Sequence, residues 1–139
     1  MKTVSATLPD GAEIKVSFFT NPANESKADN KAVGSFSIGA QLELKSGLTI
    51  GDTELGAGEY MVGALKKGEG DWTMAVSPGK MGPGAKSQLK LIELKSWFST
   101  SEARSPHSQW DITPGDGKLE GKILLVWRFG NLMLAAELS

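Results

Sequence analysis

Residues 122–138 read KILLVWRFGNLMLAAEL, and this stretch gives the clearest indication of the fold. Alternate positions from Ile123 to Phe129 are apolar, and Leu124 and Val126 between them are apolar as well. Apolar residues on both faces are typical of a central strand that is covered on both sides. Gly130-Asn131 fits a two-residue hairpin turn with glycine first. The stretch therefore predicts a hairpin of two strands joined at Gly130-Asn131.

The same period-two pattern recurs toward the N-terminus. Ile14, Val16 and Phe18 alternate with polar residues, and Asp10-Gly11 before them is a typical tight-turn pair, which predicts a first hairpin. Further alternating segments, separated by turns that mostly contain glycine, lie at 36–44, 48–50, 60–64, 71–77 and 107–113. About ten short strands with frequent turns predict an all-β, single-domain β-sandwich over residues 1–139, jelly-roll-like or Greek-key, with little or no helix.

Two segments interrupt this pattern. In QLKLIELKSWF, residues 88–98, the alternation changes phase, and a strand with a bulge near Leu91-Ile92 is favoured over a short amphipathic helix. A second bulge is expected at Gly47. Polar loops are expected at 21–33, 78–87 and 99–106.

The overall composition excludes several classes of protein. The 139 residues contain no cysteine, so disulfides, thiolate metal sites and cysteine nucleophiles are excluded. Lys plus Arg is 15 against 16 for Asp plus Glu, which gives no field for nucleic-acid binding. We expect no membrane span. The first residues do not form a signal peptide, so a periplasmic or extracellular location would require a signal that is missing from this sequence.

The stretch SPGKMGPGAKS, residues 77–87, resembles a phosphate-binding loop at first sight. Gly79 and Gly84 have the right separation, but Ala85 places Lys86 one residue too late. The loop also leads into an alternating strand pattern, whereas a phosphate loop opens a helix. We interpret it as a connecting loop and expect no nucleotide or other cofactor.

His107 is the only histidine, and a hydrolase hypothesis could rest on it or on carboxylates that are remote from each other in the chain. Asp111 could partner it, but no nucleophile-elbow motif is present. The close acidic pairs Asp52/Glu54 and Glu69/Asp71 lack calcium-loop spacing. We therefore assign no catalytic residue and no metal ligand.

The four tryptophans separate into two pairs. Trp72 and Trp127 alternate with apolar neighbours and are expected in the core, whereas Trp97 and Trp110 border polar segments. Exposed tryptophan rings on a sheet can stack against sugars. Trp97, His107 and Trp110 are thus the candidate ligand-binding residues.

Three stretches carry a resemblance to a known family: LTIGDTELGAGEYMVGAL at 48–65, DWTMAVS at 71–77, and residues 122–138. Together they resemble an uncharacterised bacterial family of small, usually exported all-β proteins, a domain-of-unknown-function family with an A-G-x-Y core motif. The family-like positions are Gly51, Leu55, Ala57, Gly58, Tyr60, Trp72 and Trp127, with Ile14-Lys15-Val16-Ser17 and Pro22 matching its opening.

The chain also departs from this family. Residues 23–37, ANESKADNKAVGSFS, stand where the family has an arginine- and tryptophan-containing segment. A site built on those family residues would be missing here. The resemblance implies an all-β fold and export to the bacterial envelope, but no reaction.

These observations favour a non-enzymatic binding or accessory module of the bacterial envelope. Its partner would be a small molecule, a glycan or a protein, met by the loops at 21–33, 78–87 and 99–108. The alternative is a carbohydrate-binding module, which requires Trp97 and Trp110 to be exposed and coplanar. A hydrolase that uses His107 or remote carboxylates is the third hypothesis. We expect a monomer or a dimer that pairs through edge strands.

Overall fold

The computed structural model describes residues 1–22, 30–82, 84–85, 89–115 and 120–139, with only the backbone described at 101–103. The described residues form ten strands and no α-helix, which confirms the all-β prediction. The strands are β1 Lys2–Thr7, β2 Glu13–Phe18, β3 Phe36–Leu44, β4 Leu48–Ile50, β5 Thr53–Leu55, β6 Gly58–Gly68, β7 Asp71–Pro78, β8 Ile92–Glu93, β9 Trp97–Pro114 and β10 Ile123–Leu138.

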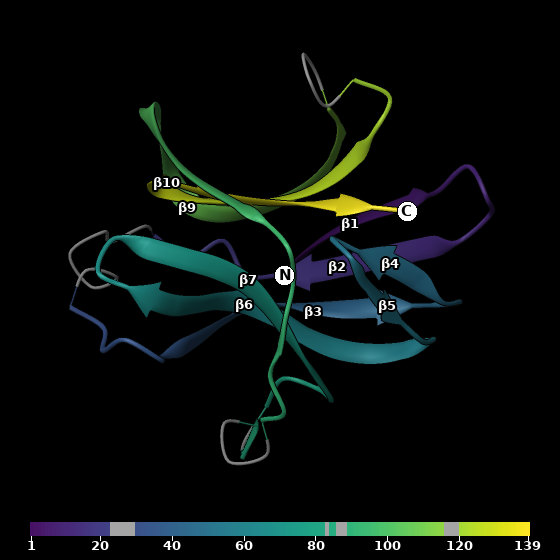
Figure 1. The fold of residues 1–139 in the computed structure, drawn as a ribbon, viewed down its shortest axis with the longest axis horizontal. Helices are drawn as coiled ribbons and strands as arrows, with labels where there is room; N and C mark the ends of the chain where they lie inside the picture. Colours follow the sequence, from purple (N-terminus) through teal and green to yellow (C-terminus); the bar gives the residue numbers. More distant parts are fainter. Residues whose placement is uncertain (23–29, 83, 86–88, 116–119) are drawn as a thin grey trace.

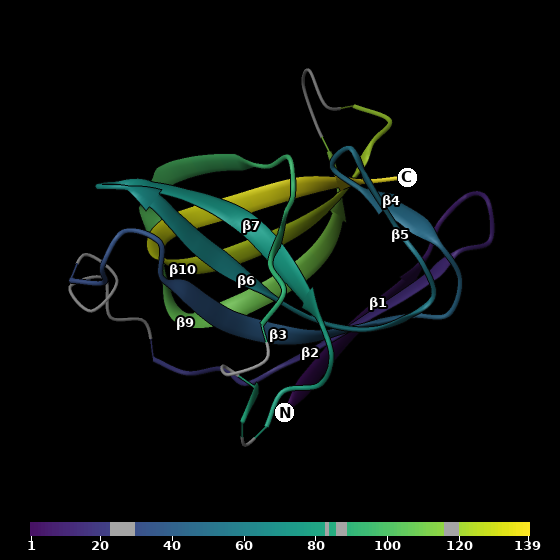
Figure 2. The same cartoon turned by 60° about the horizontal axis from the view of Figure 1, so that its bottom comes forward.

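The strands make two antiparallel sheets that pack face to face (Figure 1). The six-stranded sheet has the order β1-β2-β3-β6-β7-β8, and the four-stranded sheet has the order β5-β4-β10-β9. Between β3 and β6 the β4–β5 hairpin leaves the larger sheet, because β4 crosses over to pair with the end of β10. The larger sheet curls as a half-barrel, so that both β1–β2 and β7 approach β9 (Figure 2).

The first hairpin forms as predicted. β1 pairs with β2 from Lys2↔Phe18 to Thr7↔Glu13. The turn between them uses Gly11 at a φ of +92°, and the Asp10 carboxylate accepts a hydrogen bond from the Ala12 amide at 3.0 Å. Ile14, Val16 and Phe18 are buried, as their alternation indicated.

The prediction of a loop at 99–106 was wrong, because these residues belong to the long strand β9. β9 pairs with both ends of β10, but the register jumps from Gly130↔Ser105 to Leu132↔Thr100. Between these two pairs β9 has the four residues 101–104, whereas β10 has only Asn131. The two strands therefore bend together here, with residues 101–104 as the outer arc of the corner and Asn131 as the inner arc. The polar residues that suggested a loop therefore form a bend in two paired strands, β9 and β10.

β10 doubles back on itself at this corner, so that its two halves lie side by side (Figure 2). Gly130 takes a φ of +61° there. Leu124 and Val126 of the first half pack with Ala135 of the second half, and Lys122 pairs with Glu137 at 2.9 Å. The predicted hairpin of two strands was therefore wrong: the chain bends at Gly130, but residues 123–138 form one continuous strand, and both halves of it pair with β9, which follows the same bend.

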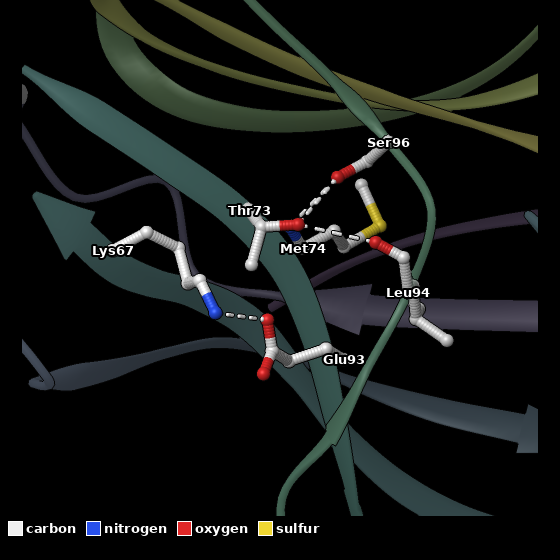
Figure 3. Close-up of polar contacts among 6 residues, drawn as sticks. All are labelled: Lys67, Thr73, Met74, Glu93, Leu94 and Ser96. Carbon is white, nitrogen blue, oxygen red and sulfur yellow. Dashed lines mark hydrogen bonds and ion pairs between the residues drawn. The ribbon is translucent and has the colours of Figure 1, made fainter.

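The predicted strand over 88–98 was wrong in extent. Residues 86–88 lie outside the described residues, β8 is only Ile92–Glu93, and Trp97 already belongs to the other sheet. Residues 94–96, here called the crossing segment, pass between the sheets (Figure 3). The Met74 amide donates to Ser96 Oγ at 2.9 Å, Ser96 Oγ contacts Thr73 Oγ1 at 3.0 Å, and Thr73 Oγ1 donates to the Leu94 carbonyl at 3.1 Å. This relay replaces the ladder that a longer β8 would have formed.

A bulge lies at Gly39 in β3, whereas Gly47 lies between strands of different sheets. The pairing of β3 with β6 shifts between Ile38↔Gly63 and Ala40↔Val62, so Gly39 is the extra residue. Gly63 is needed opposite it, because a Cβ there would lie 1.9 Å from the Ser37 carbonyl oxygen. A bulge reverses which residues face inward. Ser37, opposite Ala64, therefore takes an inward position that the alternation alone would give to Phe36 or Ile38.

Candidate functional site: an apolar cavity between the sheets

A cavity of about 420 Å³ lies where the two sheets separate. β2 pairs with β3 only along residues 41–44 of β3, so among the described residues the other half of β3 has no paired neighbour on that side. Beyond β2 the chain instead turns to β9, where the Ser108 amide donates to the Asn21 carbonyl at 2.8 Å and Pro22 bridges to His107. Residues that flank this gap, Phe19, Asn21 and Pro22 on one side and Ile38 and Gly39 on the other, line the cavity.

The cavity wall is mostly apolar and rich in aromatic rings. Phe129, Leu132 and Leu134 come from β10, and the bend at Gly130 brings both halves of that strand to the same wall. Trp72 and Ala64 contribute from the larger sheet, and Phe98 from β9. A volume of roughly 300–1,000 Å³ with apolar walls and a few polar groups is typical of small-molecule sites.

Trp127 lines the cavity, and Trp110 lies behind it. The two rings stack with centroids 5.3 Å apart and planes 8° from parallel. Trp127 Nε1 donates to Ser108 Oγ at 2.8 Å, which fixes its ring. Trp110 is fully buried, and its Nε1 has no hydrogen-bond partner among the described residues. The stacked pair makes a rigid floor for the cavity.

Four of the residues that line the cavity are polar or charged: Asn21, Lys31, Ser37 and Ser108. Ser108 already accepts the bond from Trp127. Ser37 Oγ is buried and has no partner among the described residues, as a consequence of the bulge at Gly39. Lys31 is the one charged side chain among the described lining residues, and no carboxylate of the described residues faces it across the cavity.

Lys66 holds the Lys31 end of the cavity in place. Its side chain is 1% exposed, and its Nζ donates to the Lys31 carbonyl at 2.8 Å. Its amide donates to the Ser35 carbonyl at 2.9 Å, and its carbonyl accepts from the Gly34 amide at 2.7 Å. The ammonium group also lies 5.8 Å from the centre of the Trp72 ring. Lys66 thus fixes residues 31–35 against the larger sheet.

Part of the predicted loop at 78–87 contributes to the wall as well. Gln41 donates to the Gly79 carbonyl at 3.0 Å and accepts from the Met81 amide at 2.7 Å, which places Met81 at the cavity. Pro83 and residues 86–88 lie outside the described residues, as do residues 23–29 of the loop expected at 21–33. The described chain after this loop continues into β8 and not into a helix.

The structure separates the three sequence-predicted site residues. Trp97 is 42% exposed, whereas Trp110 is 0% exposed, so the expected exposed, coplanar pair does not form. The pairings Ala135↔Trp97 and Trp127↔Trp110 put Trp97 on the outer face of the sheet and Trp110 on the inner face. Trp72 is buried in the core as predicted, and Trp127 is partly buried against it.

His107 was expected at the edge of a loop, but it lies exposed within β9. Asp111 lies four positions further along the extended strand, about 13 Å away, so the two side chains do not form a hydrogen-bonded pair. Asp111 Oδ2 instead accepts from Gln109 at 3.2 Å. The described residues hold no group of three or more His, Cys, Asp or Glu side chains suited to a metal ion.

The sequence reasoning missed the cavity residues Ser37, Gly39, Phe98 and Phe129 as a group. They come from distant strands, and no motif unites them. The one available signal was the glycine pair Gly39 and Gly63 within alternating segments, since an isolated strand glycine often marks a bulge.

Comparison of the chain with protein-family models, curated proteins and solved structures found no match. The family resemblance therefore stays a prediction. Among the residues that the structure describes, no helix is long and apolar enough to cross a membrane.

Proposed function

We propose that the protein is a non-enzymatic binding module that holds a small apolar molecule in the cavity between its two sheets. The observation that carries the proposal is the 420 Å³ cavity, with its rigid tryptophan floor and its mostly apolar wall. Burying apolar ligand surface supplies about 25 cal/mol per Å², so such a wall favours an apolar ligand over a sugar. The envelope location implied by the resemblance belongs to the same proposal.

The test is binding of a neutral apolar dye, N-phenyl-1-naphthylamine, followed by its fluorescence and by thermal unfolding. At 100 times its dissociation constant a ligand adds about 2.7 kcal/mol of stability. That corresponds to roughly 5 °C or more in melting temperature for a chain of this size.

Leu132→Trp is the informative variant, because Leu132 lines the cavity and is only partly buried, so a larger ring can fill the space. Leu91→Trp is the matched control, because Leu91 is exposed and is not among the cavity-lining residues. We expect Leu132→Trp to weaken dye binding and Leu91→Trp to leave it unchanged. Equal binding by both variants, or no binding by the unaltered chain, would contradict the proposal.

Carbohydrate binding remains the second candidate, and it rests on Trp97 alone. This ring is exposed on the outer face of β9, beside the small side chain of Ala135. Titration with soluble oligosaccharides, repeated with Trp97→Ala, tests it. Sugar binding that is lost in Trp97→Ala and kept in Leu132→Trp would favour this surface over the cavity.

A further inference from the structure

We propose that the ligand of the cavity is a single-chain carboxylate amphiphile, with its apolar chain over the tryptophan floor and its carboxylate at Lys31 and Ser37. This inference rests on the proposed function and specifies the chemical class of the ligand.

Charge is the first argument. Lys31 is the charged residue among the described cavity-lining residues, and an anion is its natural partner. Lys66 adds a second positive charge at the same end, since its Nζ bonds the Lys31 carbonyl. Glu69 contacts Lys66 at 3.3 Å, and because Glu69 is 80% exposed, solvent and salt screen its charge. This end of the cavity therefore favours a negative group.

The second argument is the unpaired hydroxyl of Ser37. A buried polar group without a hydrogen bond costs about 1–3 kcal/mol, and proteins rarely leave one without a reason. The Ser37 side chain lines the cavity, and rotation of the hydroxyl lets it donate to a carboxylate oxygen. Asn21, at the rim, can supply a further amide donor.

The third argument is size. A methylene group occupies roughly the 30 Å³ of a water molecule, so a cavity of about 420 Å³ accepts a chain of about twelve carbons. Phe98, Trp127 and Phe129 line the route that such a chain would take. Dodecanoate is therefore the probe of choice, with its methyl ester as the uncharged control of the same length.

The experiment titrates the full chain with dodecanoate and with methyl dodecanoate, each below the concentration at which it aggregates. Trp72 and Trp127 line the cavity, so intrinsic fluorescence reports occupancy, and calorimetry confirms the stoichiometry. We expect dodecanoate to bind about tenfold more tightly than the ester, in line with one charge-assisted hydrogen bond.

Two variants locate the carboxylate. Lys31→Met should remove the preference for the acid over the ester, and Ser37→Ala should weaken both ligands, because the ester carbonyl also accepts a hydrogen bond. Lys2→Met is the matched control, since Lys2 is exposed on β1, away from the cavity, and should change nothing.

The outcomes separate the two proposals. Equal affinity for acid and ester, or a preference for the acid that survives Lys31→Met, would overturn the carboxylate assignment. Binding of the neutral dye without binding of either dodecanoate or its ester would do the same and leave the proposed function standing. Failure of the dye, the acid and the ester together would overturn the proposed function itself.

Discussion

Gly39 of β3 lies so close to Trp110 of β9 that a side chain at position 39 would collide with the indole. A Cβ built on Gly39 would be 2.8 Å from Trp110 Cζ2 and 3.2 Å from its Nε1. Gly39 is also the bulged residue that turns Ser37 inward and lines the cavity. One glycine thus sets the spacing of the two sheets, the burial of Trp110 and the polarity of the cavity.

Gly39→Ala should destabilise the protein by about 1–3 kcal/mol, because the added methyl group overpacks a contact between two sheets. Urea unfolding followed by tryptophan fluorescence measures the loss. Gly56→Ala is the matched control, since a Cβ at Gly56 meets no atom within 4 Å and its φ is not positive. A Gly39→Ala protein as stable as the Gly56→Ala protein would contradict the close approach.

Trp110→Ala and Trp97→Ala should differ widely in stability. Trp110 is fully buried and stacked on Trp127, so its loss should cost about 3–5 kcal/mol. Trp97 is exposed on the outer face, so its loss should cost less than about 1 kcal/mol. Chemical unfolding of both variants checks the contrast. Equal losses would mean that the two rings do not lie on opposite faces of the sheet.

Ser96→Ala should lower the free energy of unfolding by about 1–3 kcal/mol. Ser96 Oγ accepts from the Met74 amide and contacts Thr73 Oγ1, and an alanine leaves both groups without this partner. Hydrogen exchange should show the Met74 amide losing protection. Ser5→Ala on the exposed part of β1 serves as control, and retained protection at Met74 would argue against the relay through the crossing segment.

Lys66→Ala should cost about 2 kcal/mol, far more than Lys67→Ala. Lys66 Nζ is buried and bonds the Lys31 carbonyl, which would lose this partner. Lys67 makes an ion pair with Glu93 at 2.7 Å, but both side chains are about half exposed, and such pairs contribute about 0–1 kcal/mol. Thermal unfolding at two salt concentrations compares the variants. A larger loss for Lys67→Ala would reverse this assignment.

Local sequence patterns predicted the faces of most strands. Val16 and Phe18 are buried as their alternation indicated, and the turn at Asp10-Gly11 forms. The same patterns failed at the corner of β9 and β10. The polar residues 99–106 suggested a loop when taken alone, yet they lie within β9, and Ser99, Thr100 and Ser105 pair with β10 on either side of its bend. The polar segment belongs to a strand because the residues on either side of its outer arc, Thr100 and Ser105, pair with a second strand.

The candidate site was not predictable in the same way. Trp97 and Trp110 have similar polar surroundings in the sequence, but register with β10 places one outside and one inside. Alternation along β3 would place Ser37 on the outer face of the sheet, but the bulge at Gly39 turns it toward the cavity.

The sequence by itself determined the all-β class and the first hairpin, because alternation and turn chemistry act between residues close together in the chain; at Gly130 it indicated a bend but not that the bent strand pairs with β9 along both halves. The tertiary structure alone decided that β2 leaves β3 to meet β9, that Trp110 stacks beneath Trp127, and that a cavity opens between the sheets. These features depend on which distant strands pair and where pairing stops, and that choice reflects the packing of the whole core.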